Sequence, residues 1–560
     1  MMFLNRLLIY SYNDMVYTFL KSQSLYDKNS YFAGYTPTLL GSNIKADHLT
    51  TLIWQLLSSF VPPVLLNNLF IIVALLLSII FSYIFFKKIT NDRPTSILFS
   101  LFYSFSLYFV FRVISATYSL YLMFVFPTLI HFLYMKKKPF IVGLFILFSL
   151  LLSSYYGYFL FITAVFWYLG DLILVRSTKK DKLISVFKNI LLLSGSVSVV
   201  IFIVFGNILL SNSPVFTNYE RVDRTKWDST SIVYRPLEDF YNFSFRPWYF
   251  VIPPNASVFF GALSKQVYGY IESTGYYLAD DYDEEEMGGT YLGWHLIVGV
   301  LFVGTILLGK NVFNRQYSIF TPIYNNADII KRSFLILILL LSITGPPSFT
   351  IAGQVFYTPS YLLYFLVPVF RVLVRFSIVL YLFILIINSY LFLSLYKYLT
   401  KWNGKVLVAA VTLLLQIVVF SVYLPLVNLD VPPKEVEALK NGSEKRFSYA
   451  VYPKGDYYSI FWILDHGKYL VNPEGIVVSE KFNSDEFSKN LVTPEGINAL
   501  RALKTEYLIF YGNKVDLSLL EKIGDRNKNI KSKQNLTSFF SKELGNPVYS
   551  EGDVLIYKIN

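Results

Sequence analysis

Long apolar runs rich in aromatic residues recur from Val64 to Leu426 and are separated by polar loops. Most are long enough for a helix to cross a bilayer core, which takes about 20 residues. Shorter runs must tilt with their neighbours or be extended by flanking residues. Ten spanning helices are expected, at residues 64–86, 96–111, 118–134, 140–153, 157–175, 188–210, 291–309, 333–344, 376–396 and 406–425. The pattern predicts an α-helical polytopic membrane protein with about 10–12 membrane helices.

Basic residues gather in every second loop between these helices. The five sets are Lys87, Lys88 and Arg93; Lys136, Lys137 and Lys138; Arg176, Lys179, Lys180 and Lys182; Lys310, Arg315, Lys331 and Arg332; and Lys397, Lys401 and Lys405. Loops rich in lysine and arginine stay in the cytoplasm. The alternation predicts a cytoplasmic side for these loops and an extracytoplasmic side for residues 1–63, 211–290, 345–375 and the tail.

The two ends of the chain differ in pattern from its middle. Met1–Tyr10 is apolar for too few residues to span a membrane. We expect either that this segment is the remnant of a first membrane helix or that the chain starts late and has lost that helix. The expected organisation is a first extracytoplasmic loop at 1–63, membrane helices at 64–210, a large loop at 211–290, membrane helices at 291–426 with an extracytoplasmic stretch at 345–375, and a soluble domain at 427–560.

The tail carries strand-like runs, RFSYAVY, YLIFY and DVLIYKI, and a helical run at Pro494–Lys504. Alternating strand-like and helical segments of this length predict a small extracytoplasmic α/β domain.

Composition supports a membrane protein, because 54% of the residues are hydrophobic and only 15% are charged. The net charge of +12 does not indicate a nucleic-acid partner, since many of the basic residues lie in the loops that set topology. With no cysteine and four histidines, no thiolate site is available and no histidine-rich metal site is expected. The acidic run at 280–286 is interpreted as a solvated face, with cation binding as the alternative.

The segment Pro359–Phe376 carries two arginines, Arg371 and Arg375, directly before an apolar helix. Residues four apart share one face of a helix. Arginine at the end of a membrane helix is costly unless it reaches the interface or finds a partner, and its planar fork suits phosphate oxygens. The pair is therefore either a set of interfacial anchors or a clamp for an anionic lipid head group.

Other polar and aromatic residues admit two interpretations each. Asp14 is either a helix cap or a catalytic carboxylate, and Asp47–His48 is either a cap or a site for an acceptor or a metal. Arg112 is interpreted as an interfacial anchor. Tyr155 and Tyr156 form an interfacial aromatic belt or a surface that stacks on a sugar ring.

The order of motifs resembles the GT-C glycosyltransferase superfamily, nearest to YfhO-type bacterial and archaeal membrane proteins. The motifs are Asp14; Pro37 with Gly41; Tyr291-Leu292-Gly293; and Pro359, Pro368, Arg371 and Arg375-Phe376. The resemblance covers most of residues 10–425. The chain departs from the family pattern in one respect: a typical member has a full helix before the acidic residue, whereas only a short apolar segment precedes Asp14 here.

This resemblance implies a polyprenyl-phosphate sugar donor, a glycan, lipid or protein acceptor on the outer face, and Asp14 as the acidic base. Arg371 and Arg375 would then stabilise the departing phosphate. The expected function is a glycosyltransferase of the plasma membrane, with Asp47, His48, Tyr155 and Tyr156 as further substrate-binding candidates. No cofactor is firmly expected, and a divalent cation is left open. The alternatives are a flippase or transporter for a lipid-linked glycan, which would need intramembrane charges, and a non-catalytic envelope-assembly protein.

Overall fold

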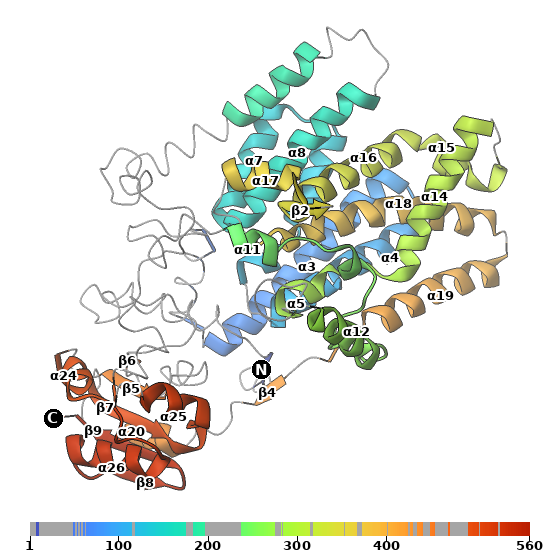
Figure 1. Ribbon diagram of the computed structural model, residues 1–560. Helices are drawn as coiled ribbons and strands as arrows, with labels where there is room; N and C mark the ends of the chain where they lie inside the picture. The colour runs from blue at the N-terminus through green and yellow to red at the C-terminus, as the bar shows by residue number, and fades with distance from the viewer. Residues whose placement is uncertain are drawn as a thin grey trace. The chain divides into compact units, whose positions relative to one another are not determined.

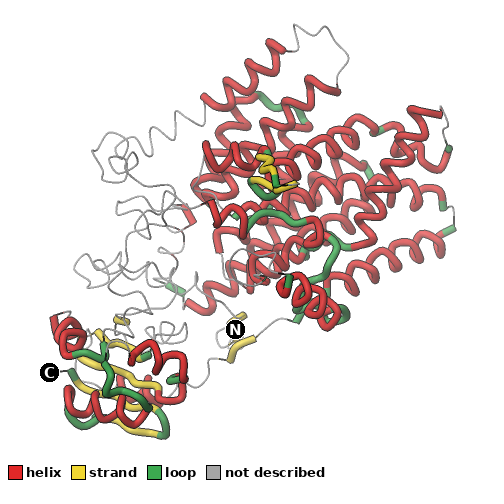
Figure 2. Tube along the Cα trace, in the orientation of Figure 1, coloured by secondary structure: helices red, strands yellow, loops and turns green. Residues whose placement is uncertain are grey.

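A computed structural model of the chain shows a large helical part and a smaller mixed part near the C-terminus (Figures 1 and 2). The chain divides into two compact units: Ile44–Trp227 with Ile232–Pro425, called here the helical unit, and Met1–Asn43, Asp228–Ser231 and Leu426–Asn560, called the C-terminal unit. The structure describes residues 7–9, 49–50, 53, 57, 60–61, 63–114, 118–174, 183–195, 237–274, 282, 284–313, 317–351, 353–366, 372–399, 401–423, 426–428, 434–440, 448–453, 469–470, 491–502, 505–524 and 527–559.

The helical unit is built from α-helices and short 3-10 turns. Its α-helices are α3 (Pro63–Thr90), α4 (Arg93–Ser104), α5 (Leu107–Ile114), α6 (Val125–Tyr134), α7 (Pro139–Leu152), α8 (Ser154–Leu174), α11 (Leu237–Asn242), α12 (Gly261–Ser273), α13 (Glu284–Met287), α14 (Trp294–Phe313), α15 (Thr321–Asn325), α16 (Ala327–Thr344), α17 (Pro359–Leu366), α18 (Ser377–Tyr398) and α19 (Trp402–Phe420). A further helix runs over Leu183–Gly195. The 3-10 turns are η3 (Tyr118–Tyr121), η4 (Pro247–Phe250), η5 (Gly288–Thr290), η6 (Ser318–Phe320) and η7 (Leu373–Phe376).

Among the described residues, six helical stretches are long and apolar enough to cross a membrane. They are Leu65–Thr90, Arg93–Ile114, Ser154–Leu174, Gly288–Gly309, Leu373–Tyr398 and Trp402–Phe420. Each coincides with one of the ten expected spans. The expected span at 118–134 is instead broken into η3 and the ten-residue helix α6, and α7 has 14 residues.

Helix α18 is the centre of the helical unit and lies among α3, α4, α14 and α16 (Figure 1). Its sequence is apolar on all sides, as expected for a helix that buries its whole circumference. Most of its side chains are buried, from Ser377 to Ser394 with few exceptions. Helix α19 is similarly apolar but largely exposed within the unit, which suits a helix whose outer surface faces lipid.

The described parts of the predicted large loop, residues 237–274, 282 and 284–290, are folded onto the membrane helices. The Phe245 amide donates to Thr344 O at 2.8 Å, and the Val374 amide donates to Phe243 O at 2.9 Å. The Tyr-Leu-Gly motif follows, and Gly293 has a φ of +82°. A side chain is disfavoured by this backbone and would also meet the Phe420 ring at 2.8 Å, so glycine is required where the chain turns into α14.

The C-terminal unit contains a five-stranded sheet in the order β6-β5-β7-β9-β8. Its strands are β5 (Ser448–Tyr452), β6 (Tyr469–Leu470), β7 (Thr505–Tyr511), β8 (Tyr549–Glu551) and β9 (Val554–Lys558). Strand β5 pairs in parallel with β6 and β7, whereas β9 pairs antiparallel with β7 and β8. Two further pairs of short strands are β1 (Leu7–Ile9) with β4 (Leu426–Asn428), and β2 (Ser348–Ile351) with β3 (Gln354–Tyr357) in the helical unit.

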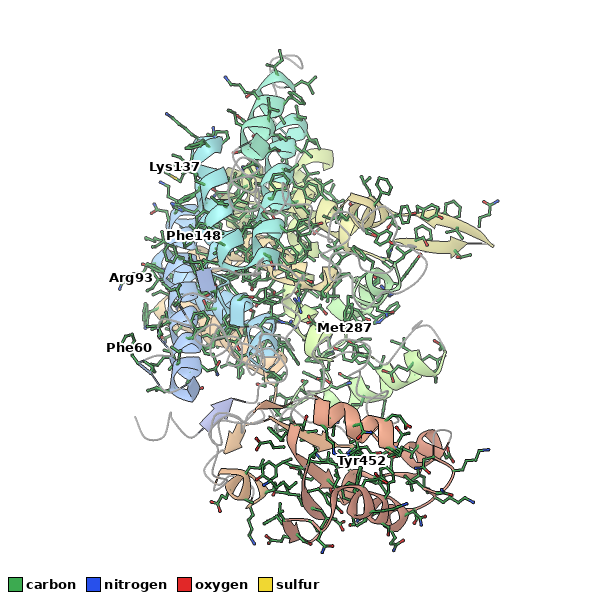
Figure 3. The ribbon with its side chains drawn as sticks, turned by 90° about the vertical axis from the view of Figure 1, so that its left-hand side faces the viewer. Phe60, Arg93, Lys137, Phe148, Met287 and Tyr452 are labelled. Atoms are coloured by element: carbon green, nitrogen blue, oxygen red, sulfur yellow. The ribbon has the colours of Figure 1, made fainter. Side chains whose placement is uncertain are left out.

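Helices cover both faces of the five-stranded sheet. On one face, α24 (Pro494–Ala502), α25 (Leu517–Gly524) and α26 (Lys533–Leu544) enclose a core around Tyr452 (Figure 3). On the other face, Leu439 of α20 (Lys434–Lys440) packs on Tyr449 and Ile509. Successive side chains along β5 and β7 point to opposite faces of the sheet and so contribute to both cores. The predicted small α/β fold is confirmed.

Candidate functional site

The candidate site is centred on Glu286, which lies in the short helix α13 directly before the span Gly288–Gly309. The backbone can approach α5 closely here because Gly288 and Gly289 have no side chains. A Cβ atom on Gly288 would lie 2.5 Å from Phe111 Cζ, and one on Gly289 would lie 3.0 Å from Tyr108 Cα. The two glycines therefore let the α13–η5 segment rest against α5 and bring Glu286 close to it.

Two guanidinium groups converge on the Glu286 carboxylate. Arg375 donates from Nε to Oε2 at 3.0 Å and from Nη2 to Oε1, which is a bidentate arrangement. Arg112 donates from Nη1 to Oε2 at 2.8 Å. Only 1% of the Arg112 side chain is exposed, with 13% for Arg375 and 14% for Glu286. We call these three residues the arginine–glutamate cluster.

The electrostatics of the cluster keep Glu286 ionised. Burial alone raises the pKa of this carboxyl, but the charges of Arg112 and Arg375 and their hydrogen bonds outweigh burial and hold the pKa at about 2, below the ordinary 4.5. A buried carboxylate that accepts several charge-assisted hydrogen bonds behaves in this way. Since one negative charge faces two positive charges, the three side chains together carry one net positive charge.

Tyrosine rings pack against both guanidinium groups. The Arg375 Cζ atom lies 4.7 Å from the centroid of the Tyr155 ring, and the Arg112 Cζ atom lies 5.5 Å from that of Tyr108. Cation–π contacts of this kind stabilise a desolvated charge. Tyr156 is fully buried behind them, and its hydroxyl donates to Leu120 O.

All four elements that form the cluster meet at one end of the helical unit. Arg112 closes a span, whereas Tyr155, Glu286 and Arg375 lie at or just before the start of their spans. This end is opposite to the end that carries Lys331 and Arg332 at the start of α16. The cluster thus lies at the side that the basic-loop pattern predicts to be extracytoplasmic.

The structure brings together two of the residues predicted from the sequence, Arg375 and Tyr155. Tyr156 lies beside them as a buried residue of the packing. The other candidates, Asp14, Asp47, His48 and Arg371, lie outside the described residues, so their roles stay predictions. No group of three or more His, Asp or Glu side chains among the described residues is arranged to hold a metal ion.

Two interpretations of the sequence were wrong. Arg112 is not an interfacial anchor but a buried partner of a carboxylate. The acidic run at 280–286 is not solvated throughout, because Glu286 turns inward and neutralises part of the charge of two arginines. The available signal was its position, since Glu286 is the last acidic residue before a Gly-Gly pair and an apolar span.

No protein-family model matches the chain, and no curated protein matches its sequence. Among solved structures, the chain is similar to the arabinofuranosyltransferase AftD from Mycobacteria, with a TM-score of 0.47 and 10% identity, covering 99% of this chain and 38% of that one. It is also similar to the Archaeoglobus fulgidus oligosaccharyltransferase in complex with zinc and sulfate, with a TM-score of 0.43 and 10% identity, covering 94% of this chain and 67% of that one.

A third similar structure is the archaeal oligosaccharyltransferase AglB from Archaeoglobus fulgidus with an inhibitory peptide and a dolichol-phosphate, with a TM-score of 0.41 and 9% identity, covering 94% of this chain and 68% of that one. The chain thus spans less than two fifths of the length of the arabinofuranosyltransferase. At these TM-scores and identities, the likeness assigns no activity.

Proposed function

We propose that this chain is a membrane glycosyltransferase that transfers a sugar from a polyprenyl-phosphate donor to an acceptor on the outer face of the plasma membrane. The observation that supports the proposal is the arginine–glutamate cluster, in which Arg112 and Arg375 both donate to the carboxylate of Glu286. Guanidinium groups held in fixed orientations suit the oxygens of a phosphate. The site lies at the ends of membrane helices, where a lipid-borne phosphate would arrive.

The position of Arg375 explains how the site would assist the chemistry. Glu286 and Tyr155 hold its guanidinium group in one orientation, so little reorganisation is needed when charge develops on a leaving group. Water is largely excluded around the cluster, and electrostatic interactions are stronger there than in bulk water. We assign Arg375, together with Arg371, to the stabilisation of the donor phosphate.

The proposed reaction has one bond formed and one bond broken. An acceptor hydroxyl loses its proton to the Asp14 carboxylate, and its oxygen forms a bond to the anomeric carbon of the sugar. The bond between that carbon and the phosphate oxygen breaks, and its electron pair leaves with the polyprenyl phosphate. Asp47 and His48 are assigned to acceptor binding and Tyr155 to the sugar, and a divalent cation is left open. Tyr156, which the sequence also suggested for the sugar, is fully buried and supports Tyr155 from within the helical unit.

The sequence resemblance to GT-C proteins adds to this proposal. In the proposed topology, the basic loops are cytoplasmic, whereas residues 1–63, 211–290, 345–375 and the C-terminal unit are extracytoplasmic. The acceptor is a glycan, lipid or protein of the cell envelope. The competing functions are movement of a lipid-linked glycan across the membrane and a non-catalytic role in envelope assembly.

The test uses the full chain in lipid nanodiscs with a panel of radiolabelled polyprenyl-monophosphate sugars and an extract of envelope acceptors. We expect the protein to release polyprenyl phosphate and to move label from the lipid to the acceptor. A parallel assay in proteoliposomes measures whether a fluorescent lipid-linked sugar becomes accessible to an impermeant quencher. Movement between leaflets with the sugar–phosphate bond intact would instead identify a transporter, and no change in either assay would favour the non-catalytic role.

A further inference from the structure

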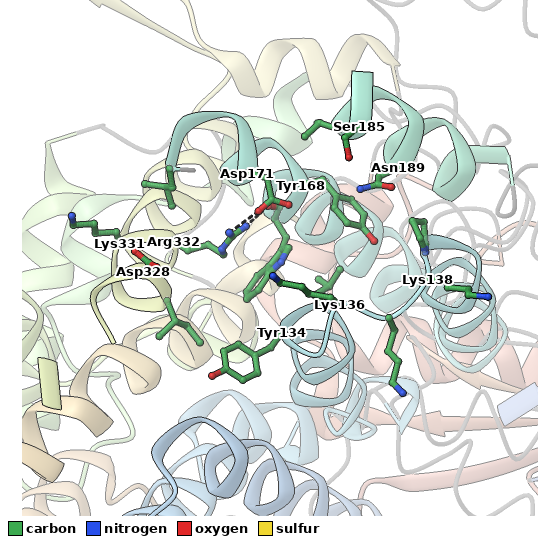
Figure 4. A pocket seen from close by; sticks show the side chains of 17 residues that line it. Tyr134, Lys136, Lys138, Tyr168, Asp171, Ser185, Asn189, Asp328, Lys331 and Arg332 are labelled. Carbon is green, nitrogen blue, oxygen red and sulfur yellow. Dashed lines mark hydrogen bonds and ion pairs between the residues drawn. The ribbon is translucent and has the colours of Figure 1, made fainter. Parts of the chain in front are cut away.

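A second polar site lies at the opposite end of the helical unit from the arginine–glutamate cluster. It is a half-open cavity of about 1100 Å³. Helix α8 runs between the two sites, with Tyr155 beside the arginine–glutamate cluster and Asp171 in the wall of the cavity. A rise of 1.5 Å per residue places these two residues about 24 Å apart. The lining residues come from α6, α7, α8, α16 and the helix Leu183–Gly195 (Figure 4).

Basic side chains dominate the polar lining of this cavity. They enter from two sides, the turn between α6 and α7 and the first turns of α16 (Figure 4). The five basic residues are Lys136, Lys137, Lys138, Lys331 and Arg332, and the two acidic residues are Asp171 and Asp328. Neutral hydrogen-bonding groups are also present, on Tyr168, Ser185 and Asn189. The cavity therefore combines a positive excess with several further hydrogen-bonding groups.

Arg332 is fixed in the wall of the cavity. Its Nη2 atom lies 2.7 Å from Asp171 Oδ1, its Nη1 atom donates to Trp167 O at 2.7 Å, and its Cζ atom lies 4.8 Å from the centroid of the Trp167 ring. Since Asp171 offsets the charge of Arg332, the excess positive charge resides on the lysines.

The turn that presents three of these lysines has an unusual backbone. Lys136 has a φ of +52°, in the left-handed region that disfavours residues with a side chain. The Lys136 amide donates to Leu133 O at 3.0 Å and the Lys137 amide donates to Phe132 O at 3.0 Å. This is a Schellman motif, in which glycine usually occupies the Lys136 position. A lysine at a position where glycine is usual is a backbone outlier, and an outlier of this kind motivates a functional hypothesis for its charge.

The outer surface of the neighbouring helix is apolar. In Leu183–Gly195, Leu183, Phe187 and Leu191 are 59%, 67% and 61% exposed, whereas Ser185 and Asn189 line the cavity. In a membrane, that apolar surface is covered by acyl chains. A lipid lying along this helix would place its head group at the level of the cavity.

We propose that this cavity binds the phosphate-bearing head group of an anionic phospholipid on the membrane face opposite to the arginine–glutamate cluster. Basic pockets between membrane helices recognise such head groups through charge and hydrogen bonds. The shared chemistry is that of a phosphate anion, and the apolar helix Leu183–Gly195 favours a lipid source over a soluble one. This site is independent of the glycosyl-transfer proposal, since it lies at the other end of α8.

The experiment measures lipid binding by native mass spectrometry and by fluorescence quenching in nanodiscs. The nanodiscs are zwitterionic and carry increasing fractions of a diphosphatidylglycerol lipid. We expect saturable binding that weakens with added salt. The double variant Lys137→Gln/Lys331→Gln should lose about fivefold in affinity for each lysine. The matched control, Lys397→Gln/Lys401→Gln, removes two exposed lysines of another loop predicted to lie on the same membrane face and should bind as the unchanged protein does.

Lys136→Gly supplies an independent variant that will not simply fail to fold. It relieves the left-handed backbone, so the apparent Tm should rise while lipid affinity falls about fivefold. A second arm titrates inorganic pyrophosphate against nanodiscs without anionic lipid. Equal loss of affinity in both double variants would overturn the proposal, as would saturable binding of pyrophosphate with no preference for the anionic lipid.

Discussion

Arg375 donates from Nε and Nη2 to the two carboxylate oxygens of Glu286, although the two residues are 89 positions apart in the sequence. The pair ties the segment before α14 to the segment before α18, the central helix of the helical unit. Arg112 donates to the same carboxylate from α5. Three membrane-helix ends are thus joined through one acidic side chain.

Replacing Glu286 by glutamine should destabilise the protein strongly. Glu286→Gln keeps the shape of the side chain but removes the negative charge to which two buried guanidinium groups donate. Breaking a buried ion pair in this way costs about 3–5 kcal/mol. The measurement is the apparent Tm of the purified protein in detergent. The matched control is Glu284→Gln, because the Glu284 carboxylate accepts from the Ala256 amide and an amide oxygen accepts equally well; we expect a change below about 1 kcal/mol. Equal shifts in both variants would show that the pairing contributes little.

Stability should depend on pH through Glu286. The pKa of Glu286 is about 2 in the folded chain against an ordinary 4.5, so the folded state favours the ionised form. Its stabilisation is fully present above about pH 4.5 and is lost as the pH falls toward about 2, by about 3 kcal/mol in total. The Tm difference between the unchanged protein and Glu286→Gln should shrink over this range. A constant difference would contradict the assignment.

Donor binding should depend on the arginines through both charge and geometry. Arg371→Ala should weaken binding of the polyprenyl-phosphate sugar by about 1.5–3 kcal/mol, and Arg371→Lys should restore it in part because the bidentate fork is lost. Donor affinity is measured by quenching of intrinsic fluorescence in nanodiscs.

Arg375 needs a control for folding, since its removal also breaks the pair with Glu286. We therefore combine Arg375→Gln with Glu286→Gln, because removing both partners of a buried pair costs less than removing one. The double variant should be more stable than Glu286→Gln alone and still bind donor weakly. Normal donor affinity in this variant and in Arg371→Ala would show that neither arginine contributes to donor binding.

Asp14→Asn should distinguish between the two possible roles of Asp14, a catalytic base and a helix cap. Asparagine is nearly isosteric but does not accept the proton, so the transfer rate should fall about 10²–10⁴-fold while donor affinity stays unchanged. Asparagine caps a helix about as well as aspartate, so a cap alone would leave the transfer rate intact. Single-turnover transfer of radiolabelled sugar gives the rate.

Gly288→Ala should destabilise the protein by forcing the segment that carries Glu286 away from α5. The added Cβ atom would meet the Phe111 ring at 2.5 Å, and overpacking of a tight core costs about 1–3 kcal/mol. Phe111→Leu in the same chain should recover part of that loss. The control Gly309→Ala has no atom within 4 Å of its new Cβ and lies in a helix, where alanine is preferred. If both alanine variants melt alike, the close approach of η5 to α5 is not tightly packed.

The sequence by itself determined the class of the protein and most of its framework. Long apolar runs can satisfy their backbone groups in a bilayer only as helices, so the six long spans could be read directly from their length. Strand-like alternation in the tail likewise predicted β5, β7 and β9, because a half-buried strand repeats every two residues. The arginine beside the central helix was also visible, since a charge next to an apolar run is conspicuous.

The partner of that arginine was decided only by the tertiary structure. The position of Glu286 before a Gly-Gly pair and an apolar span marks it within the acidic run, but the sequence does not show which side chains it contacts. Glu286 does so because Gly288 and Gly289 let its backbone approach α5, and because Arg112 and Arg375 arrive there from distant spans. The convergence of Lys136, Lys331 and their neighbours on one cavity was hidden for the same reason. Loop charges report the side of the membrane, whereas their distances depend on how the helices pack.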